Sequence, residues 1–143
     1  MFMHRICDLN KACPKENYPT LFIHQIIDAC ARSEVFLFMD GFSRYNQIQI
    51  KLKDKYKMDF IFQWGNFTYR KIPFGLKNAG ATFQRAMNFS FHDIKNIVKS
   101  YLDDFPTHSH KRIDHPDHLR LIFKRCRHYK ICLNPHKCVL CMI

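Results

Sequence analysis

The chain of 143 residues has no long hydrophobic run and no recognisable leader segment. A membrane-spanning helix needs about 20 consecutive apolar residues, a length that no stretch of this sequence approaches. The first residues, Met-Phe-Met-His-Arg, contain no apolar segment of signal-peptide length. Internal repeats and low-complexity segments are also absent. These absences argue against a membrane protein and predict an intracellular protein of the cytoplasm or nucleus that is not secreted.

Acidic residues are scarce, because 12 Asp and Glu stand against 23 Lys and Arg and leave a formal net charge of +11. A surplus of this size suits a polyanionic partner such as nucleic acid, although on charge alone a solvated basic surface fits equally well. The seven cysteines are an odd number without a secretory signal, which indicates free thiols. With 47% hydrophobic and 15% aromatic residues the chain can bury a core, which argues against a disordered protein.

Three helices are predicted where apolar residues recur at every third or fourth position. They cover about residues 20–33, about residues 78–92 and a segment that begins at Pro116, a residue that favours the first helical turn. Thr20 and Asn78 are the candidate N-caps of the first two helices.

The remaining segments are expected to be strands or loops. The predicted strands are residues 35–40, 47–53, 58–64, 67–72 and 131–133, together with a hairpin over 97–107. Gly65-Asn66 is the expected turn between the third and fourth of these strands. Residues 1–19, which Pro14 and Pro19 interrupt, are expected to be extended or looped. This mixed order predicts an α+β fold with helices packed on one face of an antiparallel sheet.

Two adjacent carboxylates, Asp103 and Asp104, follow the β-forming run 97–102 and precede Phe105. The pattern predicts a strand, a tight turn that holds both acids and a short return strand. Asp40 ends another apolar strand, so two neighbouring strands could bring three acids to one place. Such a cluster would form a metal-binding tip. An exposed acidic turn is the simpler alternative, because Asp is a common turn residue.

Several motifs occur in order along nearly the whole chain. They are Asp8 to Lys15, Phe38 to Ser43, Tyr45 to Ile48, Pro73 to Gln84 and Tyr101 to Asp104, followed by Leu133-Asn134-Pro135 with Lys137-Cys138. Together they resemble the reverse transcriptase of gypsy-type LTR retrotransposons, an RNA-directed DNA polymerase, in the form common in plants. One such motif is weak evidence, whereas five in the family's order and spacing are specific.

The resemblance implies part of the fingers and most of the palm of a right-hand polymerase. Residues of about 1–35 and 54–80 would be fingers-like, and residues of about 36–53 and 81–143 palm-like. The thumb, connection and ribonuclease H domains would be absent from this chain. We therefore expect a truncated or degraded remnant of a retrotransposon polyprotein, with little polymerase activity on its own.

The resemblance also implies roles for individual residues. Asp40 and Asp103 would bridge two Mg²⁺ (or Mn²⁺) ions and Asp104 would assist, because two such ions can clamp the attacking and leaving oxygens of a phosphoryl transfer. The substrates would be deoxynucleoside triphosphates and an RNA or DNA template-primer. The implied substrate-binding residues are Gly41, Tyr45 as the steric gate against a ribose 2′-hydroxyl, Phe74, Gly75, Tyr101, and Arg5 at the triphosphate. From its residue type alone, Tyr45 could equally be an aromatic packed in the core.

Four features depart from the family's pattern. About four residues are missing before Asp8, which would shift Arg5 out of register. Arg44 places a long cation where the family usually has a small residue, and Pro106 removes a ladder donor from the return strand. The hairpin at 58–63 lacks the usual Thr-rich sequence.

Two alternative functions are weighed against the polymerase. A zinc-binding nucleic-acid module is suggested by the density of potential ligands near the C-terminus, namely Cys126, His128, Cys132, His136, Cys138 and Cys141. Only Cys138 and Cys141 have the spacing of a zinc knuckle. A non-catalytic protein that offers a basic platform to nucleic acid would share the charge and the motifs. His115 and His118 are expected to be a solvent-exposed pair at a helix start, and the sequence predicts no oligomeric state.

Overall fold

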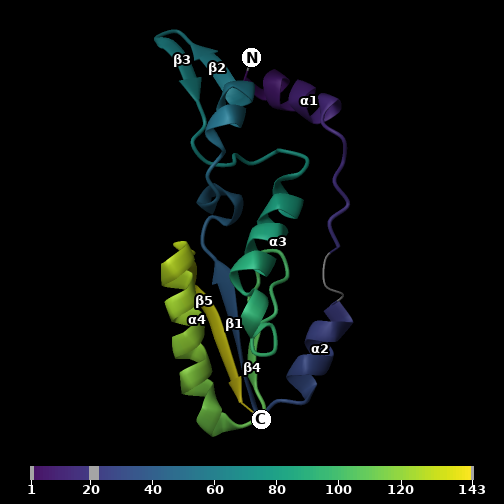
Figure 1. Cartoon of the computed structure of the whole chain (residues 1–143), viewed down its shortest axis with the longest axis vertical. Coiled ribbons are helices and arrows are strands. Elements are labelled where there is room, and N and C mark those ends of the chain that lie inside the picture. Colours follow the sequence, from purple (N-terminus) through teal and green to yellow (C-terminus); the bar gives the residue numbers. More distant parts are fainter. Residues whose placement is uncertain (1, 20–22, 143) are drawn as a thin grey trace.

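The computed structural model describes residues 2–19 and 23–142, with the backbone alone for residues 2–5. Figure 1 shows an elongated molecule with the hairpin β2–β3 and α1 at one end, and with α2, α4 and a three-stranded sheet toward the other. In chain order the elements are α1 (Phe2–Ala12), α2 (Ile23–Ala31), β1 (Val35–Gly41), the 3-10 helices η1 (Arg44–Gln47) and η2 (Leu52–Met58), β2 (Asp59–Phe62), β3 (Gly65–Thr68), α3 (Ala79–Ser90), η3 (His92–Ile94), β4 (Thr107–Ser109), η4 (Arg112–Asp114), α4 (His115–Tyr129) and β5 (Leu133–Met142). Among the described residues, no helix combines the length and the apolar character needed to cross a bilayer.

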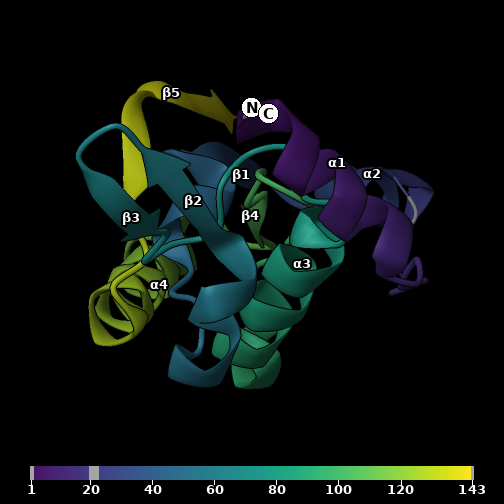
Figure 2. The ribbon, with the colours of Figure 1, turned by 90° about the horizontal axis from the view of Figure 1, so that it is seen from above.

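The sheet has the strand order β4-β1-β5, and β1 is antiparallel to both of its neighbours. Helices α3 and α4 lie on the same side of β1 and β4, as Figure 2 shows from above. The expected α+β architecture, with helices on one face of an antiparallel sheet, is therefore confirmed.

The main core lies between this sheet and the two helices. Met39 of β1 meets Phe83 and Met87 of α3, and α4 contributes Ile122 and Cys126. Phe83 and Ile122 are completely buried. Because one side of each helix carries these apolar side chains, the 3.6-residue period of the sequence predicted both helices.

The chain between α3 and β4 forms an irregular extra strand along β4. Val98 lies opposite Thr107, and the amide of Lys99 donates to the carbonyl of Pro106 at 3.0 Å. Pro106 has no N–H to return to Lys99, so this pair keeps one of its two possible hydrogen bonds. The lost donor expected from the sequence therefore weakens the outer edge of β4 and leaves its pairing with β1 intact.

The expectation that residues 1–19 are extended or looped is wrong for their first part, because Phe2–Ala12 is helical. Ile6 and Leu9, three residues apart, both face a small space near Phe60 and Leu76. One apolar side of this helix therefore packs against the rest of the chain, and this tertiary contact stabilises the helix ahead of Pro14.

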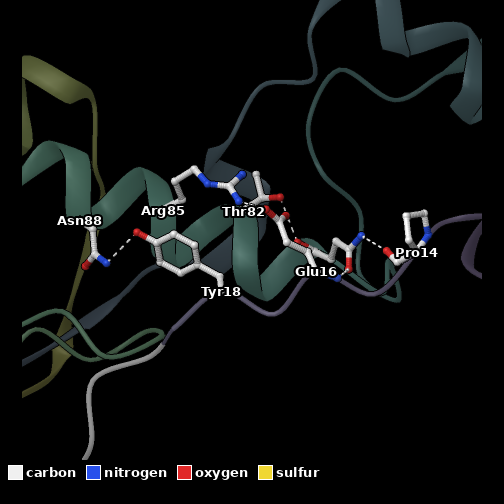
Figure 3. Close-up of polar contacts among 7 residues, drawn as sticks. Pro14, Glu16, Tyr18, Thr82, Arg85 and Asn88 are labelled. Carbon is white, nitrogen blue, oxygen red and sulfur yellow. Dashed lines mark hydrogen bonds and ion pairs between the residues drawn. The ribbon is translucent and has the colours of Figure 1, made fainter.

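After α1 the chain runs as an extended strap along α3. Figure 3 shows Pro14, Glu16 and Tyr18 of this strap facing α3. Glu16 pairs with Arg85, and the hydroxyl of Tyr18 accepts a hydrogen bond of 3.1 Å from Asn88 while its ring lies against Arg85. The strap therefore fixes α1 and α3 relative to each other without contributing to the sheet.

Of the two expected N-cap residues, only Asn78 lies among the described residues. Asn78 stands at the start of α3, but its side chain makes no cap hydrogen bond. It binds the strap instead, donating to the carbonyl of Pro14 and accepting from the amide of Glu16. Thr20, the other expected cap, lies outside the described residues.

The strand expected over residues 47–53 is wrong. Ile48 and Ile50 do alternate with Gln49 in burial, but only one isolated bridge forms, between Gln49 and Lys71. The partner segment ends at Pro73, which has no N–H to extend a ladder. The chain then turns into η2, and Leu52 stays 82% exposed.

One turn and one strand differ in detail from the expectation. In the β2–β3 hairpin Phe62 pairs with Gly65, so the turn is Gln63-Trp64 and not Gly65-Asn66. The strand expected at 131–133 begins at Leu133 and continues to Met142.

Candidate active site: three acids at adjacent strand ends

Asp40, Asp103 and Asp104 gather where β1 ends. Asp40 lies directly opposite Asp104 in an antiparallel bridge. Backbone hydrogen bonds of 2.8 Å hold the two segments on either side, from the amide of Gly41 to Asp103 and from the amide of Phe105 to Met39. The convergence of these acids, expected from two strands that each end in Asp, is what the structure shows.

Gly41 permits this close approach. A Cβ at this position would lie 3.1 Å from the ring of Phe105 and 3.4 Å from the carbonyl oxygen of Asp103. A side chain here would therefore require the ring of Phe105 to move by a few tenths of an ångström. The glycine serves the backbone geometry beneath the acids.

The turn that carries the acids is tighter than expected. Tyr101 pairs with Asp104 by reciprocal hydrogen bonds of 2.9 Å, so Leu102 and Asp103 form the turn and Asp104 already belongs to the return segment. Leu102 has a φ of 52°, which is uncommon for a residue other than glycine. Such a backbone persists only when its surroundings hold it in place.

Gln84 of α3 supplies that support, and the sequence analysis missed it. Its carboxamide oxygen accepts a hydrogen bond of 2.8 Å from the amide of Leu102, and its nitrogen donates to the carbonyl and hydroxyl of Ser100. Gln84 is completely buried, so these bonds have no competing water. A polar residue at a core position of a predicted helix was the signal that could have found it.

Two cations bind the acids. Nε of Arg44 lies 2.5 Å from Oδ2 of Asp103, and Nζ of Lys137 lies 3.4 Å from Oδ2 of Asp40. Lys137 reaches the site because the β1–β5 register shifts between Phe38 and Asp40, which leaves the residues around Lys137 in a bulge of β5. In the sequence, Lys137 belongs to a motif without an assigned role, and Arg44 stands where the family usually has a small residue.

The acids perturb one another. Burial raises the pKa of Asp103 above its ordinary value, while Arg44 opposes that shift and the charges of Asp104 and Asp40 add to it. The pKa of Asp104 is also raised, first by desolvation and then by Asp40. Carboxylates that raise each other's pKa in this way favour a nearby positive charge.

The donor set suits a hard divalent cation in chemistry, because three carboxylates converge and Mg²⁺ prefers oxygen ligands. Oδ1 of Asp103 is buried and has no hydrogen-bond partner, so one oxygen of the cluster is unsatisfied. Two other oxygens are already bound by Arg44 and Lys137. In the described part of the chain, no three His, Cys, Asp or Glu side chains are placed so that they could hold a metal ion together.

The aromatic residues expected at the nucleotide lie on one side of η1. The ring of Tyr45 makes edge contacts with Phe74 and Phe83, with centroids 5.8 Å apart in each pair. Tyr45 is half-buried and Phe74 is 57% exposed, so Tyr45 lies between the core and an open aromatic face. Gly75 follows with a φ of 96°, a conformation that suits glycine.

Three other expectations concern residues outside the acidic cluster. Arg5 belongs to α1, and its side chain lies outside the described residues. The zinc alternative loses Cys126, because that thiol lies in the main core and burial raises its pKa to about 11. His115 and His118 are not a solvent pair, since both rings contact the hydroxyl of Ser109 at 2.8 Å and His115 is buried.

Comparison with known proteins gives a consistent result. Residues 3–142 match the family described as reverse transcriptase (RNA-dependent DNA polymerase). The chain is 29% identical over 131 residues to the Transposon Tf2-3 polyprotein of Schizosaccharomyces pombe, and 28% identical to the Tf2-7 polyprotein of the same yeast. These alignments cover 91% of this chain and 10% of each polyprotein, so the chain spans about a tenth of these relatives.

Solved structures show the same fold. A foamy viral protease-reverse transcriptase in complex with double-stranded DNA superposes with a TM-score of 0.81 at 17% identity, covering 95% of this chain and 24% of that one. The foamy viral enzyme in complex with an RNA/DNA hybrid gives a TM-score of 0.78 at 17% identity, covering 92% and 18% of the two chains. The chain belongs to the reverse transcriptase family, and the expected identity as part of a reverse transcriptase domain is confirmed.

Proposed function

We propose that this chain is the catalytic part of a retrotransposon reverse transcriptase, of the gypsy type, and that it takes part in RNA-directed DNA synthesis. The observation that carries the proposal is the convergence of Asp40, Asp103 and Asp104 at adjacent strand ends. The similarity to yeast retrotransposon polyproteins supports the retrotransposon origin.

Asp40, Asp103 and Asp104 are the proposed ligands of Mg²⁺ or Mn²⁺, with two ions shared among them. Two bound ions would supply stabilisation of the attacking and leaving oxygens during nucleotidyl transfer. The unsatisfied Oδ1 of Asp103 and the mutual perturbation of the acids support a cation at this position.

The substrates proposed are a deoxynucleoside triphosphate and an RNA or DNA template-primer. Tyr45 would exclude a ribose 2′-hydroxyl, in keeping with its half-buried ring at the edge of the core. Phe74 and Gly75 would contact the sugar and the template. Tyr101 and Gly41 would line the substrate-binding surface beside the acids. Arg5 is retained as a proposed triphosphate contact on α1.

A division into fingers-like and palm-like parts is also proposed. The sheet, α3 and α4 would form the palm-like part, with residues of about 36–53 and 81–143. Residues of about 1–35 and 54–80, which include α1 and the β2–β3 hairpin, would be fingers-like. The foamy viral structures that share the fold hold double-stranded DNA or an RNA/DNA hybrid, which supports a template-primer as the partner.

Primer extension on an RNA template tests this function. Because the chain is expected to be a truncated remnant with little activity on its own, the protein at high concentration, with Mg²⁺ or Mn²⁺, should add deoxynucleotides to the primer only weakly and without processivity, and Asp103→Asn should abolish even this addition. Asp28→Asn, which removes the same single negative charge from the exposed side of α2 outside the cluster, is the charge-matched control and should extend as the unmodified protein does.

The alternative is a non-catalytic platform that binds nucleic acid through its net charge of +11. Arg44 and Lys137 already bind Asp103 and Asp40, and this favours the alternative because those carboxylates then have fewer oxygens open to a metal ion. Salt-sensitive template binding that survives Asp103→Asn, without extension under any metal condition, would establish the platform and contradict the polymerase.

A further inference from the structure

The three acids carry three negative charges at one place, and the chain itself supplies two positive charges to them. Arg44 comes from η1 and Lys137 from the bulge of β5, so the two cations approach from different elements. Two internal charges equal the charge of one divalent ion. The described state is therefore a partly neutralised form of the acidic cluster, in which two side-chain cations leave one negative charge unbalanced.

The two cations differ in how firmly they are held. Lys137 lies 3.4 Å from Asp40, and the side chains of this pair are 64% and 17% exposed. Arg44 lies 2.5 Å from Asp103, and the side chains of that pair are 50% and 12% exposed. Both carboxylates are mostly buried, so the shorter distance makes the contact of Arg44 the stronger of the two.

The backbone beneath Arg44 points to the same residue. Ser43 and Arg44 have φ values of 56° and 41°, so two consecutive residues other than glycine adopt the left-handed region. Such a backbone is strained and persists only where its surroundings hold it in place. The turn between β1 and η1 thereby brings the guanidinium of Arg44 onto Asp103.

The contact also leaves Asp103 half-satisfied. Arg44 binds Oδ2, whereas Oδ1 is buried without a partner. Asp104 makes no hydrogen bond or ion pair through its side chain within the described part of the chain. The cluster thus keeps free oxygen donors next to the one that Arg44 occupies.

We propose that Arg44 sets the metal affinity of this site, by competing with a divalent cation for the carboxylate of Asp103. The inference rests on the proposed function, because it takes Asp40, Asp103 and Asp104 as the cation ligands. Arg44 acts in it as a built-in counter-ion that a divalent cation must displace. Its guanidinium contacts the carboxylate of Asp103. Arg44 therefore tunes the affinity for the metal ion, whereas the acids bind the ion.

Mn²⁺ alone is the test ligand, with binding followed by electron paramagnetic resonance on the whole chain. Arg44→Gln, which keeps a long polar side chain without the charge, is expected to bind Mn²⁺ about tenfold more tightly than the unmodified protein. Arg44→Lys keeps the charge and should stay within about threefold of the unmodified protein. Lys137→Gln should gain less than Arg44→Gln, because its contact is longer and exposed.

Thermal unfolding gives a second readout without catalysis. In chelator, Arg44→Gln is expected to unfold at a lower temperature than Arg44→Lys, because a nearly buried carboxylate loses its partner. Saturating Mn²⁺ should raise the midpoint of Arg44→Gln more than that of the unmodified protein, since tighter binding stabilises the folded state more. Circular dichroism establishes that each variant folds.

The outcomes separate this inference from the proposed function. Equal Mn²⁺ affinity in Arg44→Gln and the unmodified protein, with binding lost in Asp103→Asn, would overturn the role of Arg44 and leave the metal site standing. A larger gain in Mn²⁺ affinity in Lys137→Gln than in Arg44→Gln would show that Lys137 is the main competitor of the metal ion, and would overturn the role proposed for Arg44. If no variant binds Mn²⁺, or if Asp103→Asn binds normally, the acids are not a cation site and both proposals fail.

Discussion

The two ends of the molecule are built in opposite ways. The sheet β4-β1-β5 packs against α3 and α4 around a core in which Phe83 and Ile122 have no exposed surface. The β2–β3 hairpin holds its aromatic residues in contact with one another but open to solvent, with Phe62 51% and Trp64 77% exposed. The acids lie at the end of the buried part. The geometry of the three acids therefore rests on the well-packed region and does not depend on the packing of the hairpin aromatics.

Truncation of a core aromatic should show the largest difference between the regions. Phe83→Ala removes a completely buried ring that contacts Tyr45, and is expected to lower the free energy of unfolding by about 3–5 kcal/mol. Trp64→Ala at the hairpin should change it by less than about 0.5 kcal/mol. Urea denaturation of both variants measures the two values. If Trp64→Ala costs as much as Phe83→Ala, the hairpin belongs to the cooperative core and the contrast disappears.

Removal of the buried polar support should come next in size. Gln84→Ala removes the side-chain partner of the amide of Leu102 and of the carbonyl of Ser100, which is expected to cost about 1–3 kcal/mol. The exposed Gln49 provides the matched control, since Gln49→Ala removes the same chemical group from the surface. The free energy of unfolding measured for the two variants should differ clearly. A Gln84→Ala variant as stable as Gln49→Ala would show that the turn holds its positive φ without help.

Acidification should destabilise the sheet region through two buried histidines. Burial lowers the pKa of His108 and of His115 below the ordinary 6.5, and neighbouring charges (Lys99, His110 and His118 for His108, and His118 for His115) lower it further. Above about pH 6.5 both rings are neutral in either state, and their contribution to stability is fully present. As the pH falls below that value the unfolded chain binds protons first, so stability is lost until the lowered pKa of the folded state is reached.

Denaturation at several pH values from about 8 to about 5 measures this loss. His115→Gln should flatten the pH dependence because the titrating ring is gone, whereas His24→Gln on the exposed side of α2 should leave it unchanged. Equal profiles for His115→Gln and the unmodified protein would remove His115 from the explanation. Asp103 and Asp104 have raised pKa values and act in the opposite sense, at pH values above their ordinary 3.8.

The smallest effect is expected from an exposed ion pair. Arg120 and Asp117 of α4 lie 2.7 Å apart, but their side chains are 75% and 76% exposed. Arg120→Ala should therefore change the free energy of unfolding by no more than about 0.5 kcal/mol, and added salt should reduce even that. A larger cost by thermal denaturation would show that surface charge contributes to the sheet region as well as packing does.

Several parts of the fold and site could be predicted from the sequence because their signals are local. The apolar period of α3 and α4 follows from the need to bury one side of a helix, and β1 follows from a continuous apolar run that ends in Asp40. The prediction that two strand ends would bring the acids together needed only the antiparallel pairing of these segments. The family resemblance added the order of the motifs, which the family match over residues 3–142 supports.

Other parts depended on partners far away in the sequence. Alternation at 47–53 predicted a strand, but that segment meets a partner for one bridge only. Gln84 supports a turn 18 residues further along the chain. Lys137 reaches Asp40 through a bulge of β5 that no local sequence pattern predicts. Proline residues predicted a looped start to the chain, whereas contacts to the loop around Gly75 and Lys77 accompany a helix there.

The sequence by itself determined the fold class, the helices that cover the sheet and the three acids, because burial periodicity and strand-end carboxylates are properties of short segments. Only the tertiary structure decided that Arg44 and Lys137 would partly neutralise those acids and that Gln84 would hold their turn. Charge pairing and hydrogen bonding act through space over a few ångströms, and the residues that come so close are chosen by the packing of the whole chain.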